Sequence, residues 1–257
     1  MSNAQKLQVV TGFAGLPFGP VSECAVGEVG ILGVPCEVEK GPRFGAALAP
    51  DALRAMAERV GTEFPAPGRD LGNIEPTGDW SGAVGQLVSQ MAHLGVVPVV
   101  LGGAEDVATA VLGALPELPV VAAMPRIRED LVAREVNTVW LGLNGAQPAE
   151  VWGKISQRSM LWRTARQLDE GGIANISKIP ERGGLWLDVS VIDLGHAAGV
   201  VGLNPGGMKP ETLVATVEAM ACEWQVIVIT GLAPARDTRG LSELAALETL
   251  TAAFRHG

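Results

Sequence analysis

The chain alternates short, uninterrupted apolar runs with longer segments in which apolar residues recur every three or four positions. The runs are rich in Val, Ile and Leu and have the length of strands, which predicts that they form buried strands. They lie at 29–35, 96–101, 119–124, 138–143, 184–192 and 224–230, with a shorter one at 159–162. Strands that are apolar on both faces are typical of a parallel sheet covered on both sides.

The segments between the runs predict amphipathic helices. In one of them Val84, Leu87, Val88 and Met91 share a helical face, and Gly95 follows as a stop signal. Helices that alternate with buried strands indicate an α/β fold class, with a mostly parallel sheet in a three-layer α/β/α arrangement.

The chain shows no linker, change of composition or internal repeat that would divide it. We therefore expect a single domain over residues 28–257. Residues 1–27 are rich in Gly and Pro and are expected to form an N-terminal arm.

Composition narrows the range of partners. Hydrophobic residues make up 47% of the chain and charged residues only 18%, which is below the usual quarter. A deep core or an oligomer that hides part of its surface explains this, and the oligomer is favoured. The net charge of -9, without a cluster of Lys and Arg, argues against nucleic acid or an anionic membrane surface as partner.

The expected location is the cytoplasm. The first residues lack the apolar core of a secretory signal, and no apolar run approaches the length of a membrane span. The three cysteines, Cys24, Cys36 and Cys222, show no metal-ligand spacing. An odd count of this kind points to reduced thiols.

Acidic and polar side chains lie near or after the carboxyl ends of two of the predicted strands, where loops of a parallel sheet meet at one edge. The candidates are Glu105, Asp188, Ser190, Asp193 and His196.

These candidates do not make a recognisable catalytic set. A two-metal hydrolytic site needs several converging carboxylates or imidazoles, and no histidine lies between these acids. A Ser190, His196 and Asp193 triad would lack the strained G-x-S-x-G elbow. The loop after 119–124 stays apolar until Arg126. The residues therefore assign no catalytic group and no metal ligand.

Several ordered motifs resemble the ureohydrolase family, which comprises arginases, agmatinases and formimidoylglutamases. The motifs are GVPCEVEKGPRFGAALAPDALRAM, DLGNI, PVVLGGAEDVATAVLGAL, WLDVSVIDLGHAAGVVGLNPGG and VIVITGLAPARDTRGLSELAA. The resemblance covers residues 28–255 and includes the frame residues Gly41, Arg43, Gly45, Pro50 and Arg54. It implies the three-layer ureohydrolase fold.

The chain departs from the family where the family binds two metal ions. Glu105 stands at the position of the family's histidine ligand, and of the Asp-x-Asp pair only Asp188 remains as an aspartate. Ala104 stands for the aspartate before that histidine, and Ser190 for the second aspartate of the pair. Gly231 and Ala233 stand for the glutamate and the asparagine of the last strand. Where the family has Asp-x-His-x-Asp, the strand ends in Ala122, Ala123 and Met124, and the long loop after it is missing. One aspartate and one glutamate cannot hold two divalent ions, because too little negative charge offsets their dehydration. We therefore expect a vestigial pocket lined by Glu105, Asp188, Ser190, Asp193 and His196.

The resemblance implies a noncatalytic, structural or regulatory subunit of a heteromeric amidine hydrolase. Family members form trimers and hexamers, and metformin hydrolase pairs a metal-bearing chain with a degenerate one. The partner would then be a catalytic ureohydrolase chain that holds nickel or manganese, and the substrate a guanidine or a biguanide such as metformin.

Two alternatives stay open. A stand-alone binding or regulatory pseudoenzyme would pair a guanidinium ligand with Asp188 and Glu105. A metal-independent enzyme would use Asp188, Asp193 and His196.

Overall fold

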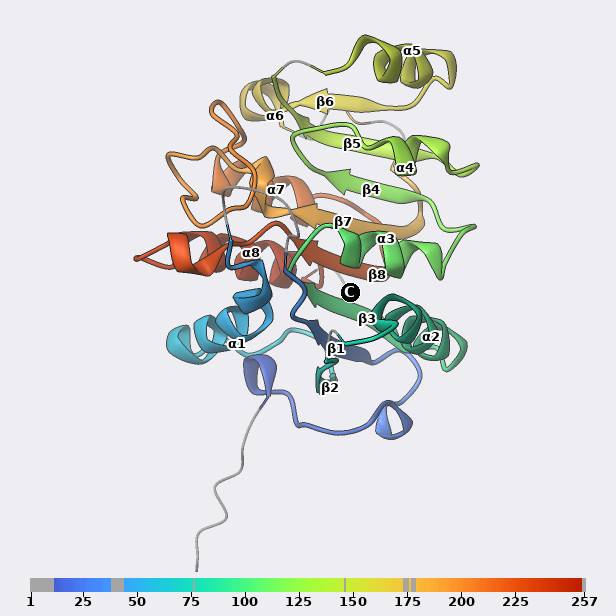
Figure 1. Ribbon diagram of the computed structural model, residues 1–257, viewed down its shortest axis with the longest axis vertical. Coiled ribbons are helices and arrows are strands. Elements are labelled where there is room, and N and C mark those ends of the chain that lie inside the picture. Colours follow the sequence, from blue (N-terminus) through green and yellow to red (C-terminus); the bar gives the residue numbers. More distant parts are fainter. Residues whose placement is uncertain are drawn as a thin grey trace, which may run out of the picture.

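A parallel sheet forms the centre of the molecule (Figure 1). The structure, a computed structural model, describes residues 12–37, 44–75, 77–145, 147–172, 176 and 179–255. Within these residues eight strands pair in the order β2-β1-β3-β8-β7-β4-β5-β6, and each pairing is parallel. The strands are β1 (Val29–Val34), β2 (Gly68–Asn73), β3 (Val97–Gly102), β4 (Val120–Ala123), β5 (Thr138–Leu143), β6 (Trp162–Thr164), β7 (Arg182–Asp188) and β8 (Glu223–Thr230).

Helices cover both faces of the sheet, which confirms the predicted three-layer α/β/α arrangement (Figure 1). One apolar core lies under α1 (Ala49–Val60), α6 (Ala165–Gly171), α7 (Pro210–Glu218) and α8 (Leu241–Ala252). The other lies under α2 (Trp80–His93), α3 (Asp106–Gly113), α4 (Glu129–Ala133) and α5 (Ala149–Gln157). Successive strand residues alternate between the cores, as Ile227 and Val228 do. None of the helices in the described part is long and apolar enough to cross a membrane.

The sheet order places the carboxyl ends of β3, β8, β7 and β4 side by side. Asp188 at the end of β7 pairs with Thr230 at the end of β8, and Ala123 of β4 pairs with Leu187. The loops that leave these four strands therefore meet at the middle of one sheet edge.

Some elements differ from the sequence expectation. The strand expected at 184–192 ends at Asp188, because a 3-10 turn follows in which the Asp188 side chain accepts the Ser190 N–H. The short strand expected at 159–162 instead occupies Trp162–Thr164. Strand β2 and helices α4 and α5 were not expected; β2 is a polar strand at the sheet edge, so it lacks a continuous apolar run.

The described part of the expected arm packs onto the domain. Phe13 is fully buried and lies edge-on to Phe64, with ring centroids 5.8 Å apart. Its N–H donates to the buried Asp70 carboxylate at 2.8 Å. Residues 1–11 of the arm, and the frame residues Gly41 and Arg43, lie outside the described residues.

Candidate functional site

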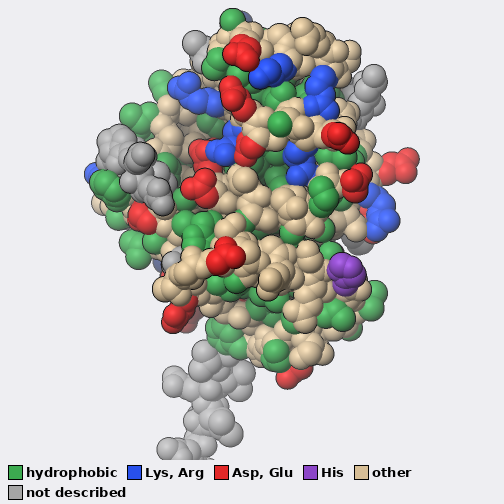
Figure 2. All heavy atoms as spheres, turned by 45° about the vertical axis from the view of Figure 1, so that its right-hand side comes forward, with side chains coloured by type: hydrophobic (Ala, Val, Ile, Leu, Met, Phe, Trp, Pro, Cys, Tyr) green, Lys and Arg blue, Asp and Glu red, His purple; other side chains and the backbone are tan. Residues whose placement is uncertain are grey.

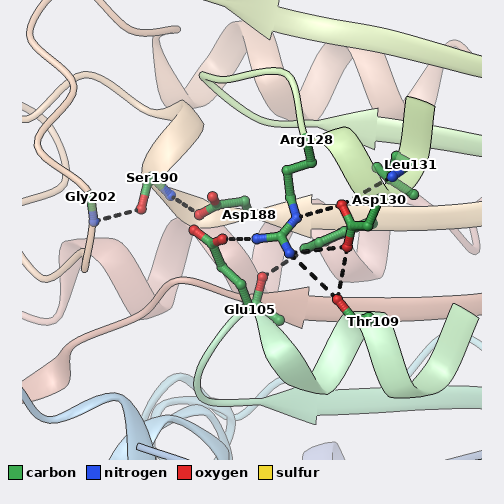
Figure 3. A network of polar contacts seen from close by, with 10 residues as sticks. Glu105, Thr109, Arg128, Asp130, Leu131, Asp188, Ser190 and Gly202 are labelled. Atoms are coloured by element: carbon green, nitrogen blue, oxygen red, sulfur yellow. Dashed lines mark hydrogen bonds and ion pairs between the residues drawn. The ribbon is translucent and has the colours of Figure 1, made fainter. Parts of the chain in front are cut away.

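An arginine forms the centre of a polar network at the carboxyl edge of the sheet (Figure 3). Arg128 lies in the loop between β4 and α4, directly before the first residue of that helix. Its guanidinium reaches across to the β3–α3 connection and lies over a side chain of β7. We call this group the Arg128 cluster; it consists of Arg128, Glu105, Thr109, Asp130 and Trp186.

All three nitrogens of the Arg128 guanidinium contact oxygen atoms of neighbouring side chains. Its Nη1 donates to the carboxylate of Glu105. Its Nε and Nη2 donate to the two oxygens of Asp130, each at 3.0 Å, and Nη2 also lies 3.5 Å from the Thr109 hydroxyl. Its Cζ lies 5.0 Å from the ring centroid of Trp186, within the range of a cation–π contact.

The surroundings of the cluster fix its charge state. Burial works against ionisation of Arg128, but the hydrogen bond to Asp130 and the charge of Glu105 outweigh it, so the pKa of Arg128 is raised. Burial also opposes ionisation of Asp130, but the hydrogen bond and charge of Arg128 lower the pKa of that carboxyl. Both groups are therefore charged at neutral pH, as an ion pair with partial access to solvent.

Asp188 lies beside the cluster at the end of β7 and is only 6% exposed. Its Oδ1 accepts the Ser190 N–H at 2.9 Å, while the Ser190 hydroxyl accepts the Gly202 N–H at 3.0 Å (Figure 3). Burial, together with the negative charge of Glu105, raises the pKa of Asp188 to about 7, against the opposing effects of Ser190 and Arg128. The carboxyl is thus only partly ionised at neutral pH.

The structure brings together some of the residues expected to line a vestigial pocket and separates the others. Glu105, Asp188 and Ser190 meet at the carboxyl edge. The carboxylate of Asp193 instead accepts the N–H groups of Gly195 and Gly206, at 2.8 and 2.6 Å. Asp193 therefore organises the glycine-rich loop after β7.

His196 lies in that same loop, and its side chain is exposed. Its backbone N–H donates to the Asp193 carbonyl at 2.9 Å, which fixes the turn rather than a site. Nothing in these contacts directs the imidazole toward Glu105 or Asp188.

Small and apolar residues fill the positions where the family resemblance placed other ligands. Ala104 is 3% exposed and Met124 is 1% exposed. Gly231 has a φ of +83°, and a Cβ built on it would lie 2.1 Å from Asp188 Oδ1. No side chain at 231 fits unless Asp188 moves, because the Asp188 carboxylate takes up that space.

The donor set does not fit a dinuclear metal centre. Among the residues that the structure describes, no three His, Cys, Asp or Glu side chains are grouped so that they could hold a metal ion. Glu105 and Asp130 are engaged by Arg128, whose positive charge opposes that of any added cation. The described residues therefore offer no set of ligands for a dinuclear metal centre at this edge of the sheet.

Sequence analysis missed the residue at the centre of the network. It treated the loop after β4 as apolar up to Arg126 and gave no role to Arg128, Asp130, Thr109 or Trp186. The signal was the charged run RIRED placed directly after a buried strand. Such a run at the carboxyl end of a central strand lies where the site lies, whereas most charged runs only coat a surface.

Comparison with known proteins agrees with this architecture. Residues 27–123 match the model of the arginase family, which leaves more than half of the chain unmatched. No curated protein sequence matches the chain.

Several solved structures share the fold. An agmatine ureohydrolase of Thermoplasma volcanium is 17% identical, with a TM-score of 0.77 over 92% of this chain and 90% of its own. The proclavaminate amidino hydrolase from Streptomyces clavuligerus is 18% identical, with a TM-score of 0.76 over 95% and 97%. A formiminoglutamase of Trypanosoma cruzi, solved with Mn²⁺, is 15% identical, with a TM-score of 0.71 over 88% and 91%. The chain thus has the arginase- and agmatinase-like α/β fold.

Proposed function

We propose that this chain is a ureohydrolase-family protein that serves as a noncatalytic, structural or regulatory subunit of a heteromeric amidine hydrolase in the cytoplasm. The fold and the match over residues 27–123 support the family. The observation that carries the noncatalytic role is the Arg128 cluster: a guanidinium paired with Glu105 and Asp130 stands at the sheet edge in place of a group of metal ligands.

The hydrolytic chemistry then belongs to the partner. Attack of water on a guanidinium carbon at neutral pH requires a strongly activated nucleophile, which a bound divalent metal supplies by lowering the pKa of its water. A partner with a complete set of carboxylate and imidazole ligands would hold nickel or manganese and act on a guanidine or a biguanide such as metformin. This chain would stabilise that partner or shape the entrance to its site.

Exposed apolar side chains support an assembled state. Phe44, Leu48, Leu203 and Leu241 are each between 45% and 56% exposed. Burial of these side chains against another chain would remove their apolar surface from water, which favours association. On the face seen in Figure 2, acidic and basic side chains lie interspersed, without an extended basic patch of the kind that binds nucleic acid.

The two alternative functions lack such support. A stand-alone guanidinium-binding protein would need the Glu105 carboxylate, which Arg128 already occupies. A metal-independent enzyme would need Asp193 and His196 beside Asp188, but Asp193 is used by the loop and His196 is exposed.

The test is co-expression with ureohydrolases of the same organism that have a complete His and Asp ligand set. We expect one of them to co-purify with this chain as a defined hetero-oligomer by native mass measurement. Its activity on guanidines should exceed that of either chain alone, and the metal should follow the partner. Two tightly bound metal ions and turnover in this chain alone would refute the proposal.

A further inference from the structure

We propose that Arg128 is a tethered ligand: its guanidinium occupies a guanidinium-binding site of the chain's own making and closes that site to free cations. Resting on the proposed noncatalytic role, this proposal places Arg128 where a ligand would lie between Glu105 and Asp130. Glu105, Asp130 and Trp186 then form a latent site for small guanidinium compounds, which is accessible only when the Arg128 side chain is removed.

The contacts of Arg128 are those that a free guanidinium ion would require. Its N–H groups donate to two carboxylates. One is that of Glu105, and the other is that of Asp130, both of whose oxygens accept. The Arg128 Cζ lies over the indole ring of Trp186, 5.0 Å from the ring centroid. In-plane carboxylates and a facing aromatic ring recognise a planar, delocalised cation, whereas they suit a compact ammonium or a metal ion poorly.

The aromatic face is held in place. Trp186 is fully buried, and its Nε1 donates to the Thr230 hydroxyl at 2.8 Å. Its orientation therefore comes from β7 and β8 rather than from Arg128. Removal of the Arg128 side chain should therefore leave the Trp186 ring in the same position.

The loop that carries Arg128 is anchored on both sides. The Ile127 N–H donates to Gln147 Oε1 at 3.0 Å, and the Arg128 carbonyl accepts the Val132 N–H of α4 at 3.1 Å. Because the tether is short and fixed, the arginine is present at a high effective concentration. A free guanidinium compound therefore competes poorly in the wild-type chain.

Charge balance favours a cation at this place. Glu105 and Asp130 pair with Arg128, and Asp188 lies close enough for the charges of Glu105 and Arg128 to act on it. Without Arg128 these acids would repel one another with no counter-charge among them. The loss of Arg128 should therefore both destabilise the chain and create affinity for a cation of matching shape.

The experiment is a thermal denaturation of Arg128→Ala with methylguanidinium chloride at low millimolar concentration, far below denaturing levels. We expect the variant to melt below the wild type and to regain about 3 °C at a concentration roughly tenfold above the dissociation constant. Sodium chloride and methylammonium chloride at equal ionic strength should give no comparable gain. The wild type should not respond to methylguanidinium.

Two further variants sharpen the test. Arg126→Ala removes an exposed arginine from the same loop and should behave like the wild type in every salt. Arg128→Ala combined with Glu105→Gln should lose the response to methylguanidinium. If Arg128→Ala does not fold alone, Arg128→Gln and refolding yield in the presence of methylguanidinium provide the same readout.

The proposal would be overturned if methylguanidinium stabilised neither Arg128→Ala nor Arg128→Gln. It would also be overturned if methylguanidinium stabilised the wild type to the same extent. Stabilisation of Arg128→Ala by Mn²⁺ or Ni²⁺ but not by methylguanidinium would also overturn it, since the closed site would then be a metal site. These measurements use the chain alone, so they do not depend on whether a catalytic partner is found.

Discussion

Arg54 of α1 holds the fully buried carboxylate of Asp70 in a two-pronged pair, with Nε and Nη2 each 2.8 Å from one oxygen. The same carboxylate accepts the N–H groups of Phe13 and Gly72 at 2.8 and 2.9 Å. Through these contacts one side chain joins the N-terminal segment, the first helix and the edge strand β2.

Replacement of Arg54 by Met should therefore lower the free energy of unfolding by about 3–5 kcal/mol, because it leaves a buried charge without its partner. Urea denaturation measures the change. Arg166→Ala serves as control: this arginine pairs with Glu170 on the exposed surface of α6, so its removal should have no measurable effect. Equal stability of the two variants would contradict a structural role for the Arg54 pair.

Asp188→Asn should change how stability depends on pH. The pKa of Asp188 is about 7 in the folded chain and near 3.8 when exposed, so the folded state binds the proton more tightly. The wild type should lose this stabilisation as the pH rises from about 4 to about 7. The asparagine variant keeps the oxygen that accepts the Ser190 N–H but has no proton to lose, so its curve should be flatter.

The advantage of Asp188→Asn over the wild type should reach about 2–4 kcal/mol above pH 8, measured by chemical denaturation across the pH range. Asp106→Asn removes one negative charge from the exposed first turn of α3 and is the matched control. Parallel curves for wild type and Asp188→Asn would show that the carboxyl does not titrate differently in the folded chain.

Gly231→Ala should destabilise the chain by about 2–4 kcal/mol, because a positive φ and a clash with the Asp188 carboxylate act together. Gly61→Ala separates the two causes. Gly61 has a φ of +66°, but its added Cβ would meet nothing within 4 Å, so only the backbone strain of about 1 kcal/mol applies. Thermal melts of both variants check the difference, and equal losses would rule out the clash.

Arg134 stabilises the end of α3 by donating to backbone carbonyls. Its guanidinium reaches the carbonyl oxygens of Leu112, Leu115 and Leu118 at 2.8 to 3.0 Å. Arg134→Lys keeps the charge but loses the fork, so we expect a loss of about 1–3 kcal/mol. Faster amide exchange over residues 112–118 should accompany it; an unchanged exchange rate there would argue against this capping role.

The sequence predicted the sheet and its covering helices because buried parallel strands leave a direct signal, a run of Val, Ile and Leu. It failed at β2, where Asp70 is buried by pairing rather than by being apolar. In the site, Glu105 was found because it follows the strand predicted at 96–101, and Asp188 and Ser190 because they lie near the end of the strand predicted at 184–192.

Arg128 was not found, because its role depends on which strands are neighbours. Only the order β3-β8-β7-β4 brings the loop after β4 within reach of Glu105 and over Trp186. Spacing along the chain carries no such information. The sequence likewise does not reveal how the loop after β7, which carries Asp193 and His196, turns on itself through the N–H groups of Gly195 and Gly206.

The approach of Asp188 to the Gly231 backbone also limits which side chains position 231 can accept. An acidic residue introduced at 231 would place a second carboxylate against that of Asp188, and its Cβ would overlap Asp188 Oδ1. Redesign of this sheet edge to carry another acid would therefore have to change positions 188 and 231 together.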